Sequence, residues 1–180
     1  STIYGTLAVA AVLFILSLTL PNINDLNKIN KAQSILIKSE DGQIIGSFGD
    51  IYGEYINYDE FPTSLTDAVV ATEDRNFYHH YGVDPLGLLR ATYANIKAGH
   101  VVQGGSTITQ QVAKNVFLSP DRNIIRKLKE MLLAFKLEHR FSKEEIISIY
   151  LNRVYLGAGS YGVDAASKRY FDKSARELNL

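Results

Sequence analysis

The stretch DPLGLLRATYANIKAG, which runs from Asp84 to Gly99, carries the signals needed to begin, continue and end one helix. An Asp before Pro85 is the favoured order of a helix cap and a first helical residue, and glycine is the favoured residue just past a helix end. The apolar residues between these signals recur at the spacing of one helix face: Leu86, Leu89, Tyr93 and Ile96. This spacing predicts an amphipathic helix.

Similar signals recur along the chain after residue 62. Helix starts are predicted where a capping residue precedes an apolar pattern, at Ser64, Ser106, Ser119-Pro120, Ser142 and Ser174, with another helix over about Val163 to Phe171. Ser142 with Glu145 is a full capping box. Residues 34–50 alternate instead between apolar and polar around Asp41-Gly42, which indicates a β-hairpin. We therefore expect a mainly α domain behind a small β element.

The amino-terminal run, residues 2–20, contains no charged residue. Roughly 20 apolar residues span the hydrocarbon core of a bilayer, and no polar face recurs in this run at helical spacing. We therefore expect residues 1–21 to form a transmembrane anchor, with a buried core helix as the alternative. Residues 22–58 would then be a juxtamembrane linker with the hairpin, and residues 59–180 the main domain.

The composition argues against several classes of protein. The formal net charge is zero, because Lys+Arg 19 balance Asp+Glu 19. Nucleic-acid binders usually carry an excess of basic residues, so no nucleic-acid partner is expected. The chain has no cysteine, which excludes a disulfide framework and a cysteine-ligated metal.

The segment EDRNFYHHYG, Glu73 to Gly82, contains the first candidate functional group. Glu73 and Asp74 fall near the carboxyl end of an apolar helix, where the helix dipole disfavours acidic side chains. A local rule broken without visible compensation is expected at functional sites, and an exposed, fraying acidic pair is the alternative. The aromatic residues that follow would partly desolvate a carboxylate and raise its pKa toward that of a general base. His79 and His80 lack the spacing of a helical zinc site, so packing or hydrogen bonding is expected for both.

A second carboxylate, Glu130, lies four residues after Arg126, so both side chains face the same side of a helix. Glu130 is opposite the predicted core stripe and is flanked by Leu133 and Leu137. That stripe consists of Ile124, Leu128, Met131 and Phe135. The position favours the wall of a cleft, with an ordinary surface ion pair as the alternative.

Glycines and cations lie near the two carboxylates. Gly104 and Gly105 precede the predicted Ser106-capped helix, which leaves backbone N–H groups free to meet an anion. The basic residues that follow are Lys114, Arg122, Arg126, Lys127, Lys129 and Arg153. A charge run is usually a solvated face, but these cations alternate with the candidate cleft residues. Carboxylates with a cation cluster indicate sugar transfer from a phosphate leaving group, because pyrophosphate needs positive charge and no proton to leave.

Four ordered motifs resemble those of glycosyltransferase family fifty-one, and the resemblance covers the chain from about residue 59 to the end. In order, the motifs are Glu73-Asp74 with Phe77, His80 and Gly82; Gly105-Ser106-Thr107 with Thr109-Gln110-Gln111; Arg126-Lys127 with Glu130; and Lys143, Ile146, Tyr150 and Asn152. The fifth motif of this family, an arginine pair, does not occur before residue 180. We therefore expect the domain to continue beyond that residue.

The resemblance implies a lysozyme-like fold and the activity of a peptidoglycan glycosyltransferase. Such domains occur in class A penicillin-binding proteins and monofunctional transglycosylases, polymerise lipid II and are the target of moenomycin. By position, Glu73 would deprotonate the 4-hydroxyl of the acceptor. Attack by this hydroxyl would convert the α-linked donor to a β-1,4 bond with inversion. Glu130 would assist near the donor or orient the cations that bind it. The substrate-binding residues that the resemblance implies are Asp74, His80, Ser106, Thr107, Gln110, Gln111, Lys114, Arg122, Arg126, Lys127, Lys129, Tyr150, Asn152 and Arg153.

The resemblance also implies partners and a location. We expect lipid II, the growing glycan chain and the bilayer as partners, together with a following transpeptidase domain and other cell-wall synthesis proteins. No cofactor is obligatory, and a divalent ion, Mg or Mn, is allowed at the pyrophosphate. The catalytic domain is expected on the outer face of the bacterial cytoplasmic membrane, behind a single-pass anchor. The rivals are a lysozyme-like lytic glycosidase, which has no pyrophosphate to bind, and a binding module, which needs no paired carboxylates.

Overall fold

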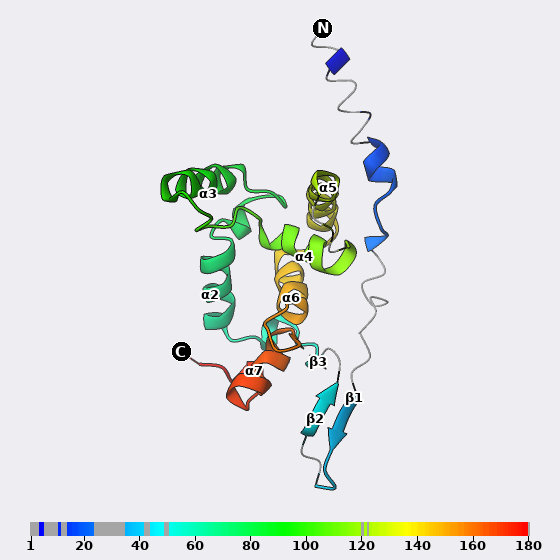
Figure 1. The fold of residues 1–180 in the computed structure, drawn as a ribbon, viewed down its shortest axis with the longest axis vertical. Coiled ribbons are helices and arrows are strands. Elements are labelled where there is room, and N and C mark those ends of the chain that lie inside the picture. Colours follow the sequence, from blue (N-terminus) through cyan, green and yellow to red (C-terminus); the bar gives the residue numbers. More distant parts are fainter. Residues whose placement is uncertain are drawn as a thin grey trace.

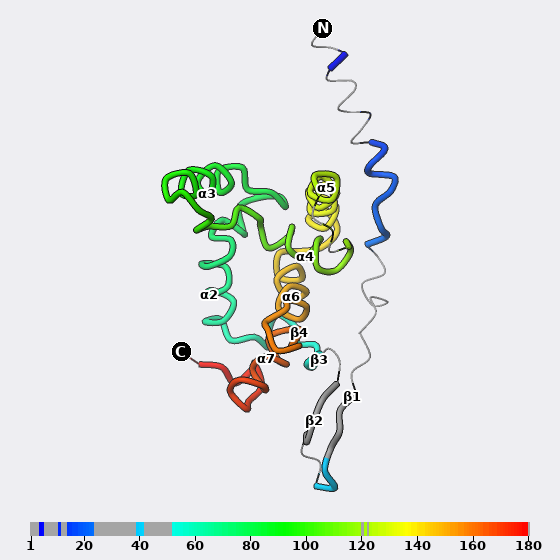
Figure 2. The backbone as a smooth tube through the Cα atoms, in the orientation of Figure 1, coloured from blue at the N-terminus to red at the C-terminus, as the bar shows by residue number. Residues whose placement is uncertain are grey.

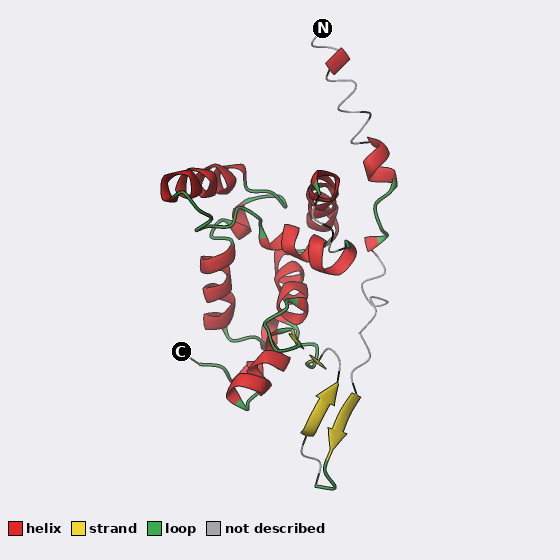
Figure 3. Cartoon of the chain, in the orientation of Figure 1, coloured by secondary structure: helices red, strands yellow, loops and turns green. Residues whose placement is uncertain are grey.

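A computed structural model describes residues 4–5, 11, 14–23, 35–41, 44–48, 51–119, 121 and 123–179 as a mainly helical chain, which fits a lysozyme-like domain. In chain order, its elements are β1 (Ile35–Lys38), β2 (Ile44–Phe48), β3 (Ile51–Tyr52), η2 (Tyr58–Glu60), α2 (Thr63–Glu73), η3 (Phe77–His79), α3 (Pro85–Ala98), α4 (Ile108–Phe117), α5 (Ile124–Arg140), α6 (Lys143–Arg153), β4 (Ser160–Tyr161), α7 (Val163–Phe171) and η4 (Ala175–Glu177). Figure 1 and Figure 3 show the helices together, with β1 and β2 extending away from them.

The core lies where α4 packs against α5 and α6. Residues 146–151 of α6 are all buried, so this helix runs through the interior. The core also includes Phe77 from the segment after α2 and Ile56 from the segment before it, both fully buried. The helices that carry most of the candidate site are therefore fixed by the core itself.

Two short strand pairs accompany the helices. β1 pairs antiparallel with β2, Ile35 opposite Phe48, with Asp41 in the turn between them, while Gly42 of the predicted hairpin lies outside the described residues. β3 pairs in parallel with β4, and Figure 2 shows these distant segments side by side. The second pair brings residues 51–52 next to the loop that follows α6.

Local capping signals predict two helices well. For α3, Asp84 is the N-cap, Pro85 is the first helical residue, and Gly99 ends the helix with a left-handed φ of 73°. For α6, Ser142 and Glu145 form the predicted capping box. Both predictions are confirmed, because all the groups that decide these ends lie within a few residues of each other.

Other predicted starts are wrong. α2 begins at Thr63 with Pro62 in the cap position and not after Ser64. The cap of α4 is Thr107 rather than Ser106, and that of α5 is Asn123 rather than Ser119, because these are the side chains that accept a backbone N–H of the first turn. Ser174 caps the next element as predicted, since its side chain accepts the N–H of Arg176, but that element is the 3₁₀ turn η4 and not an α-helix.

The predicted core stripe of α5 is also wrong. Ile124 is 81% exposed and Phe135 is 49% exposed. The buried residues of the helix are Glu130, Leu133, Ala134 and Leu137. Both faces of α5 carry apolar residues, and α4 packs against the face that includes the carboxylate. The other face lies at the surface.

The predicted anchor, residues 1–21, falls partly outside the described residues. Among the residues that are described, no helix combines the length and apolar character required to cross a bilayer. Part of this segment lies beside α5: Nζ of Lys136 donates to the carbonyl of Ser17 at 3.4 Å, and Leu20 packs against the core.

Candidate active site

The two adjacent acids at the end of α2 have different surroundings. Asp74 is 7% exposed, and its Oδ2 accepts hydrogen bonds from the backbone N–H of Ile108 at 3.0 Å and from Nε2 of His80 at 2.9 Å. Ile108 is the first residue of α4, so this carboxylate lies at the positive end of the α4 dipole. An acid that is unfavourable at the end of α2 is therefore favourable at the start of α4. The predicted hydrogen bonding of His80 is confirmed.

Glu73, in contrast, faces outward, and its Oε2 accepts a 2.9 Å hydrogen bond from Nε2 of Gln111. The prediction that following aromatic residues desolvate this carboxylate is wrong, because Phe77 is buried in the core and Tyr81 is 80% exposed. A different aromatic residue, Tyr150, lies within electrostatic reach of Glu73. Burial, followed by the negative charge of Glu73, raises the pKa of Tyr150 to about 12, which keeps this phenol neutral.

Glu130 is 2% exposed, and each of its carboxylate oxygens meets a cation. Oε2 accepts a 3.1 Å hydrogen bond from Nη1 of Arg126, and Oε1 accepts one from Nζ of Lys127. The same Nζ donates to Oγ of Ser106 at 2.8 Å. Arg126 and Glu130 pair on one face of α5, as their spacing predicts. The prediction that Glu130 forms the wall of a cleft is wrong, because its carboxylate is buried and Arg126 and Lys127 line the cavity in its place. Lys127 additionally ties α5 to the loop before α4.

Two cavities meet beside these groups. The carboxylate cavity, of about 650 Å³, is lined by Glu73, Asp74, Ser106, Thr107, Gln111 and Lys114 together with residues of α3 and the loop after it. The cation cavity, of about 900 Å³, is lined by Lys114, Arg126, Lys127 and Arg153 together with polar, apolar and tyrosine side chains. Lys114 lines both cavities, so the cavity with the exposed carboxylate adjoins the cavity with the cations at this side chain.

The start of α4 is occupied by groups of the protein itself. Asp74 takes the N–H of Ile108, and Oγ1 of Thr107 accepts the N–H of Gln110 at 3.1 Å. Oε1 of Gln110 in turn accepts the N–H of Thr107 at 3.0 Å. Three N–H groups at this helix start are therefore bound within the protein and are not free for a substrate anion. Gln110, one of the predicted substrate-binding residues, is 3% exposed and serves this cap.

Four further predicted residues line neither of these two cavities: His80, Lys129, Tyr150 and Asn152. Asn152 is turned toward the backbone of Ile56, to whose carbonyl it donates at 2.7 Å and from whose N–H it accepts at 2.9 Å. Lys129 lines a smaller neighbouring cavity of about 350 Å³, which shares Arg126 with the cation cavity. Arg122 lies outside the described residues.

The tyrosines of the cation cavity were not predicted as site residues. Tyr52, Tyr155 and Tyr161 line this cavity, and the guanidinium carbon of Arg153 lies 5.8 Å from the ring centroid of Tyr52. The sequence signal for two of them is RVYLGAGSYG, in which glycines with positive φ fold the chain back on itself. No local signal connects Tyr52 to this loop, because the pairing of β3 with β4 is long-range.

Known proteins are similar to this chain over most of its length. A family model described as transglycosylase matches residues 41–180. The penicillin-binding protein 1A of Aquifex aeolicus is 51% identical over 139 residues, which are 77% of this chain and 19% of that protein. Those of Neisseria flavescens and Vibrio cholerae are 42% and 40% identical over 178 residues, 99% of this chain and 22% of each relative. The chain thus spans about a fifth of the length of these curated relatives.

Proposed function

This chain belongs to the transglycosylase family, and on that premise we propose that it is a peptidoglycan glycosyltransferase that polymerises lipid II into β-1,4 glycan strands. The observation that carries the proposal is the junction of the two cavities at Lys114. It places an exposed carboxylate, Glu73, next to a group of cations. Transfer of a sugar from pyrophosphate requires a base for the acceptor and positive charge for the leaving group.

In the proposed reaction, Glu73 accepts the proton of the acceptor 4-hydroxyl while that oxygen attacks the anomeric carbon of the donor. The bond from this carbon to the pyrophosphate oxygen breaks, and the configuration changes from α to β. Undecaprenyl pyrophosphate leaves with the bonding electron pair. Gln111 holds the Glu73 carboxylate by its 2.9 Å hydrogen bond, which orients the base before the acceptor arrives.

Lys114, Arg126 and Lys127 would stabilise the negative charge that develops on the pyrophosphate. Glu130 acts through two of them, because it fixes Arg126 and Lys127 at the wall of the cation cavity. Among the described residues, no three His, Cys, Asp or Glu side chains are placed to hold a metal ion. The described residues that line the cation cavity include no carboxylate, and the proposal uses no metal in any step.

The contacts of Glu130 also bear on the rival lytic glycosidase. Hydrolysis of a glycosidic bond requires a carboxylic acid that protonates the leaving oxygen, in addition to a second carboxylate. Protonation of Glu130 would leave two cations without their buried partner, and Asp74 is occupied by Ile108 and His80. Asp84, the third carboxylate that lines the carboxylate cavity, is 7% exposed, so Glu73 is the exposed carboxylate of this cavity. One exposed carboxylate suits transfer from pyrophosphate better than hydrolysis.

We further propose that the domain works at the outer face of the cytoplasmic membrane, anchored by residues 1–21. The uncharged run at the amino terminus supports this location, as do exposed apolar side chains on two helices. On α3 these are Leu86, Leu88, Leu89, Tyr93 and Ile96, and on α5 they are Ile124, Ile125 and Phe135. Lipid II and the growing strand would be bound there. A transpeptidase domain and other cell-wall synthesis proteins are proposed partners, supported by the greater length and the penicillin-binding names of the relatives.

The test is Glu73→Gln assayed on labelled lipid II in detergent, with products separated on gels. Loss of a general base should lower the polymerisation rate by roughly 10²–10⁴-fold. Glu144→Gln is the matched control, because Glu144 is an exposed glutamate outside both cavities, and it should polymerise at the wild-type rate. A Glu73→Gln variant that still polymerises like the control would refute the assignment. Cleavage of finished glycan without elongation would establish the glycosidase instead.

A further inference from the structure

Three tyrosine rings gather at one end of the cation cavity. Tyr52 and Tyr161 stack with centroids 5.1 Å apart and an interplanar angle of 20°, and the rings of Tyr155 and Tyr161 lie 5.0 Å apart. Tyr155 is 55% exposed. We call this group (Tyr52, Tyr155 and Tyr161) the tyrosine platform. It lines the same cavity as the cations that the proposed function assigns to pyrophosphate.

The loop that carries two of these rings is held by its own backbone. An isolated antiparallel bridge joins Tyr155 to Tyr161, and the N–H of Gly162 donates to the carbonyl of Val154 at 2.8 Å. Gly162 has a φ of 82°, and a Cβ at this position would lie 2.7 Å from the carbonyl oxygen of Asn152. The platform is therefore presented by a tightly folded loop, which lowers the entropy cost of binding on it.

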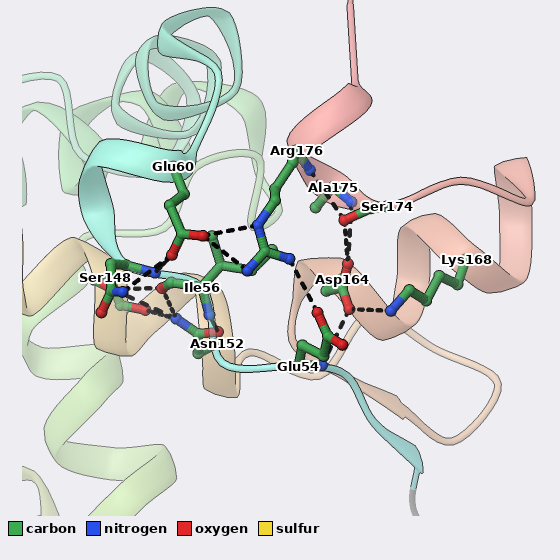
Figure 4. Close-up of polar contacts among 11 residues, drawn as sticks. Glu54, Ile56, Glu60, Ser148, Asn152, Asp164, Lys168, Ser174, Ala175 and Arg176 are labelled. Carbon is green, nitrogen blue, oxygen red and sulfur yellow. Dashed lines mark hydrogen bonds and ion pairs between the residues drawn. The ribbon is translucent and has the colours of Figure 1, made fainter.

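The third ring is fixed by the polar network of Figure 4. Oδ2 of Asp164 accepts the N–H of Glu54 at 3.0 Å, two residues beyond Tyr52. Asp164 is itself held by the ion pair with Lys168 at 2.9 Å and by the hydroxyl of Ser174 at 2.9 Å. A Cβ on Gly53 would lie only 2.5 Å from the backbone nitrogen of Ala165, so β3 follows α7 closely. These contacts set the position of Tyr52 under the loop.

The chemistry of the platform suits sugar rings. The C–H groups of a pyranose ring form an apolar face that packs on an aromatic ring, while the sugar hydroxyls need polar partners at the edge. In the platform, the exposed ring of Tyr155 supplies such an apolar face, whereas Tyr52 already packs against Tyr161 and the guanidinium of Arg153. The guanidinium of Arg153 lies over Tyr52 and adds hydrogen-bond donors at the same end.

The rest of the cavity separates sugar from lipid. Its aliphatic lining residues, Val116, Leu118 and Ile124, lie on α4, just after it and on α5. This is the side on which the amino-terminal segment packs, since Leu118 also lines a cavity with Thr19 and Pro21. A polyprenyl tail would follow the aliphatic side, which leaves the tyrosine platform for the glycan.

We propose that the tyrosine platform is a subsite for saccharide rings of the growing donor strand, beyond the sugar that carries the pyrophosphate. The inference rests on the proposed function, because it takes Lys114, Arg126 and Lys127 as the pyrophosphate site of the same strand. A donor consisting of a single disaccharide would use the platform less than a longer strand. The platform therefore favours elongation of an existing strand over the first coupling of two lipid II molecules.

The test compares Tyr155→Ala with Tyr55→Ala in the full-length protein. Tyr55 is 56% exposed, against 55% for Tyr155, and does not line the cation cavity, so it is the matched control. The measured quantity is the rate with a lipid-linked octasaccharide donor divided by the rate with lipid II as donor. Loss of one stacked ring should lower this ratio roughly threefold to tenfold in Tyr155→Ala and leave it unchanged in Tyr55→Ala. Equal ratios in both variants would overturn the proposal.

A binding measurement separates this subsite from the proposed function. Ring signals of labelled tyrosines are followed by NMR during titration with a lipid-free peptidoglycan tetrasaccharide, with its disaccharide, and with undecaprenyl phosphate in detergent. Larger shifts of Tyr155 and Tyr161 with the tetrasaccharide than with the disaccharide support the subsite. This result supports the subsite even if the protein elongates no donor. Only the proposed function would then fail. Shifts with undecaprenyl phosphate alone, or no shifts at all in an active protein, overturn it.

Discussion

Replacement of Asp74 is expected to lower stability, whereas replacement of its neighbour Glu73 lowers activity alone. Asp74 belongs to the same acidic pair, yet its Oδ2 serves the first N–H of α4 and the ring of His80. Asp74→Asn keeps an oxygen in this position, so both hydrogen bonds persist without the charge. Asp74→Ala removes the acceptor and leaves two buried donors without partners.

The magnitudes follow from these contacts. In Asp74→Asn, the two hydrogen bonds lose the strength that the negative charge gives them, and the favourable interaction of this charge with the α4 dipole is lost. Together these losses should lower the free energy of unfolding by about 1–3 kcal/mol. In Asp74→Ala, each donor left unsatisfied costs about 1–3 kcal/mol, and the lost dipole interaction brings the total to about 3–6 kcal/mol. For a chain of this length, 1 kcal/mol lowers Tm by roughly 2–4 °C. Glu73 is exposed with one hydrogen bond, so Glu73→Gln should change the free energy of unfolding by less than about 1 kcal/mol.

The assay is urea and thermal unfolding followed by far-UV circular dichroism, with wild type, Asp74→Asn, Asp74→Ala and Glu73→Gln measured side by side. Wild type and Glu73→Gln should be equally stable, Asp74→Asn should be less stable, and Asp74→Ala should be the least stable. Amide exchange at the first turn of α4 should accelerate in the two Asp74 variants. Wild-type stability in Asp74→Ala would refute the reasoning, because it would mean that the start of α4 does not depend on this carboxylate.

Two other variants test ion pairs away from Glu73. Glu130→Gln leaves Arg126 and Lys127 without their buried carboxylate. Because the Lys127 side chain is 43% exposed and can be solvated, the free energy of unfolding should fall by about 1–3 kcal/mol in urea titrations, and unchanged unfolding would contradict a structural role for this carboxylate. At Asp164, burial acts to raise the pKa, but the ion pair with Lys168 and the accepted hydrogen bonds outweigh it and lower that pKa. The stabilisation is therefore present above the unfolded pKa of about 3.9 and is lost as pH falls through the lower folded value, so wild type and Asp164→Asn should converge in Tm below about pH 4. A Tm difference that stays constant from pH 7 to pH 3 would contradict it.

Local signals in the sequence predict those parts of the structure that local groups decide. The cap and stop of α3 and the capping box of α6 each involve residues within a few positions of one another. The same is true of Arg126 and Glu130, which share one helix face. For these features, propensity, capping and spacing all favour one outcome, and no distant group competes with it.

The errors occur where distant segments decide. α5 has two apolar faces, and only the packing of α4 selects the one with Leu133 and Leu137. The choice of Thr107 over Ser106 as the cap of α4 leaves Ser106 for Lys127 on α5. Asp74 is unfavourable in its own helix, and its compensation is a backbone N–H 34 positions away in sequence. Periodicity and capping rules contain no information about such pairings.

The helix α4 connects the proposed base to one of the cations on the leaving-group side. Its first residue is bound by Asp74, Gln111 holds Glu73, and Lys114 lines both cavities. Gln111 and Lys114 are three positions apart, so about 4.5 Å of helix rise separates the group that orients the base from a cation of the leaving-group side. Proton acceptance and departure of pyrophosphate must occur together, and a single rigid helix keeps their groups at a constant separation. It follows that a displaced α4 would weaken both steps even with every reacting group present. Asp74→Ala, which removes the acceptor at the start of α4, should therefore lose more activity than its folded fraction accounts for.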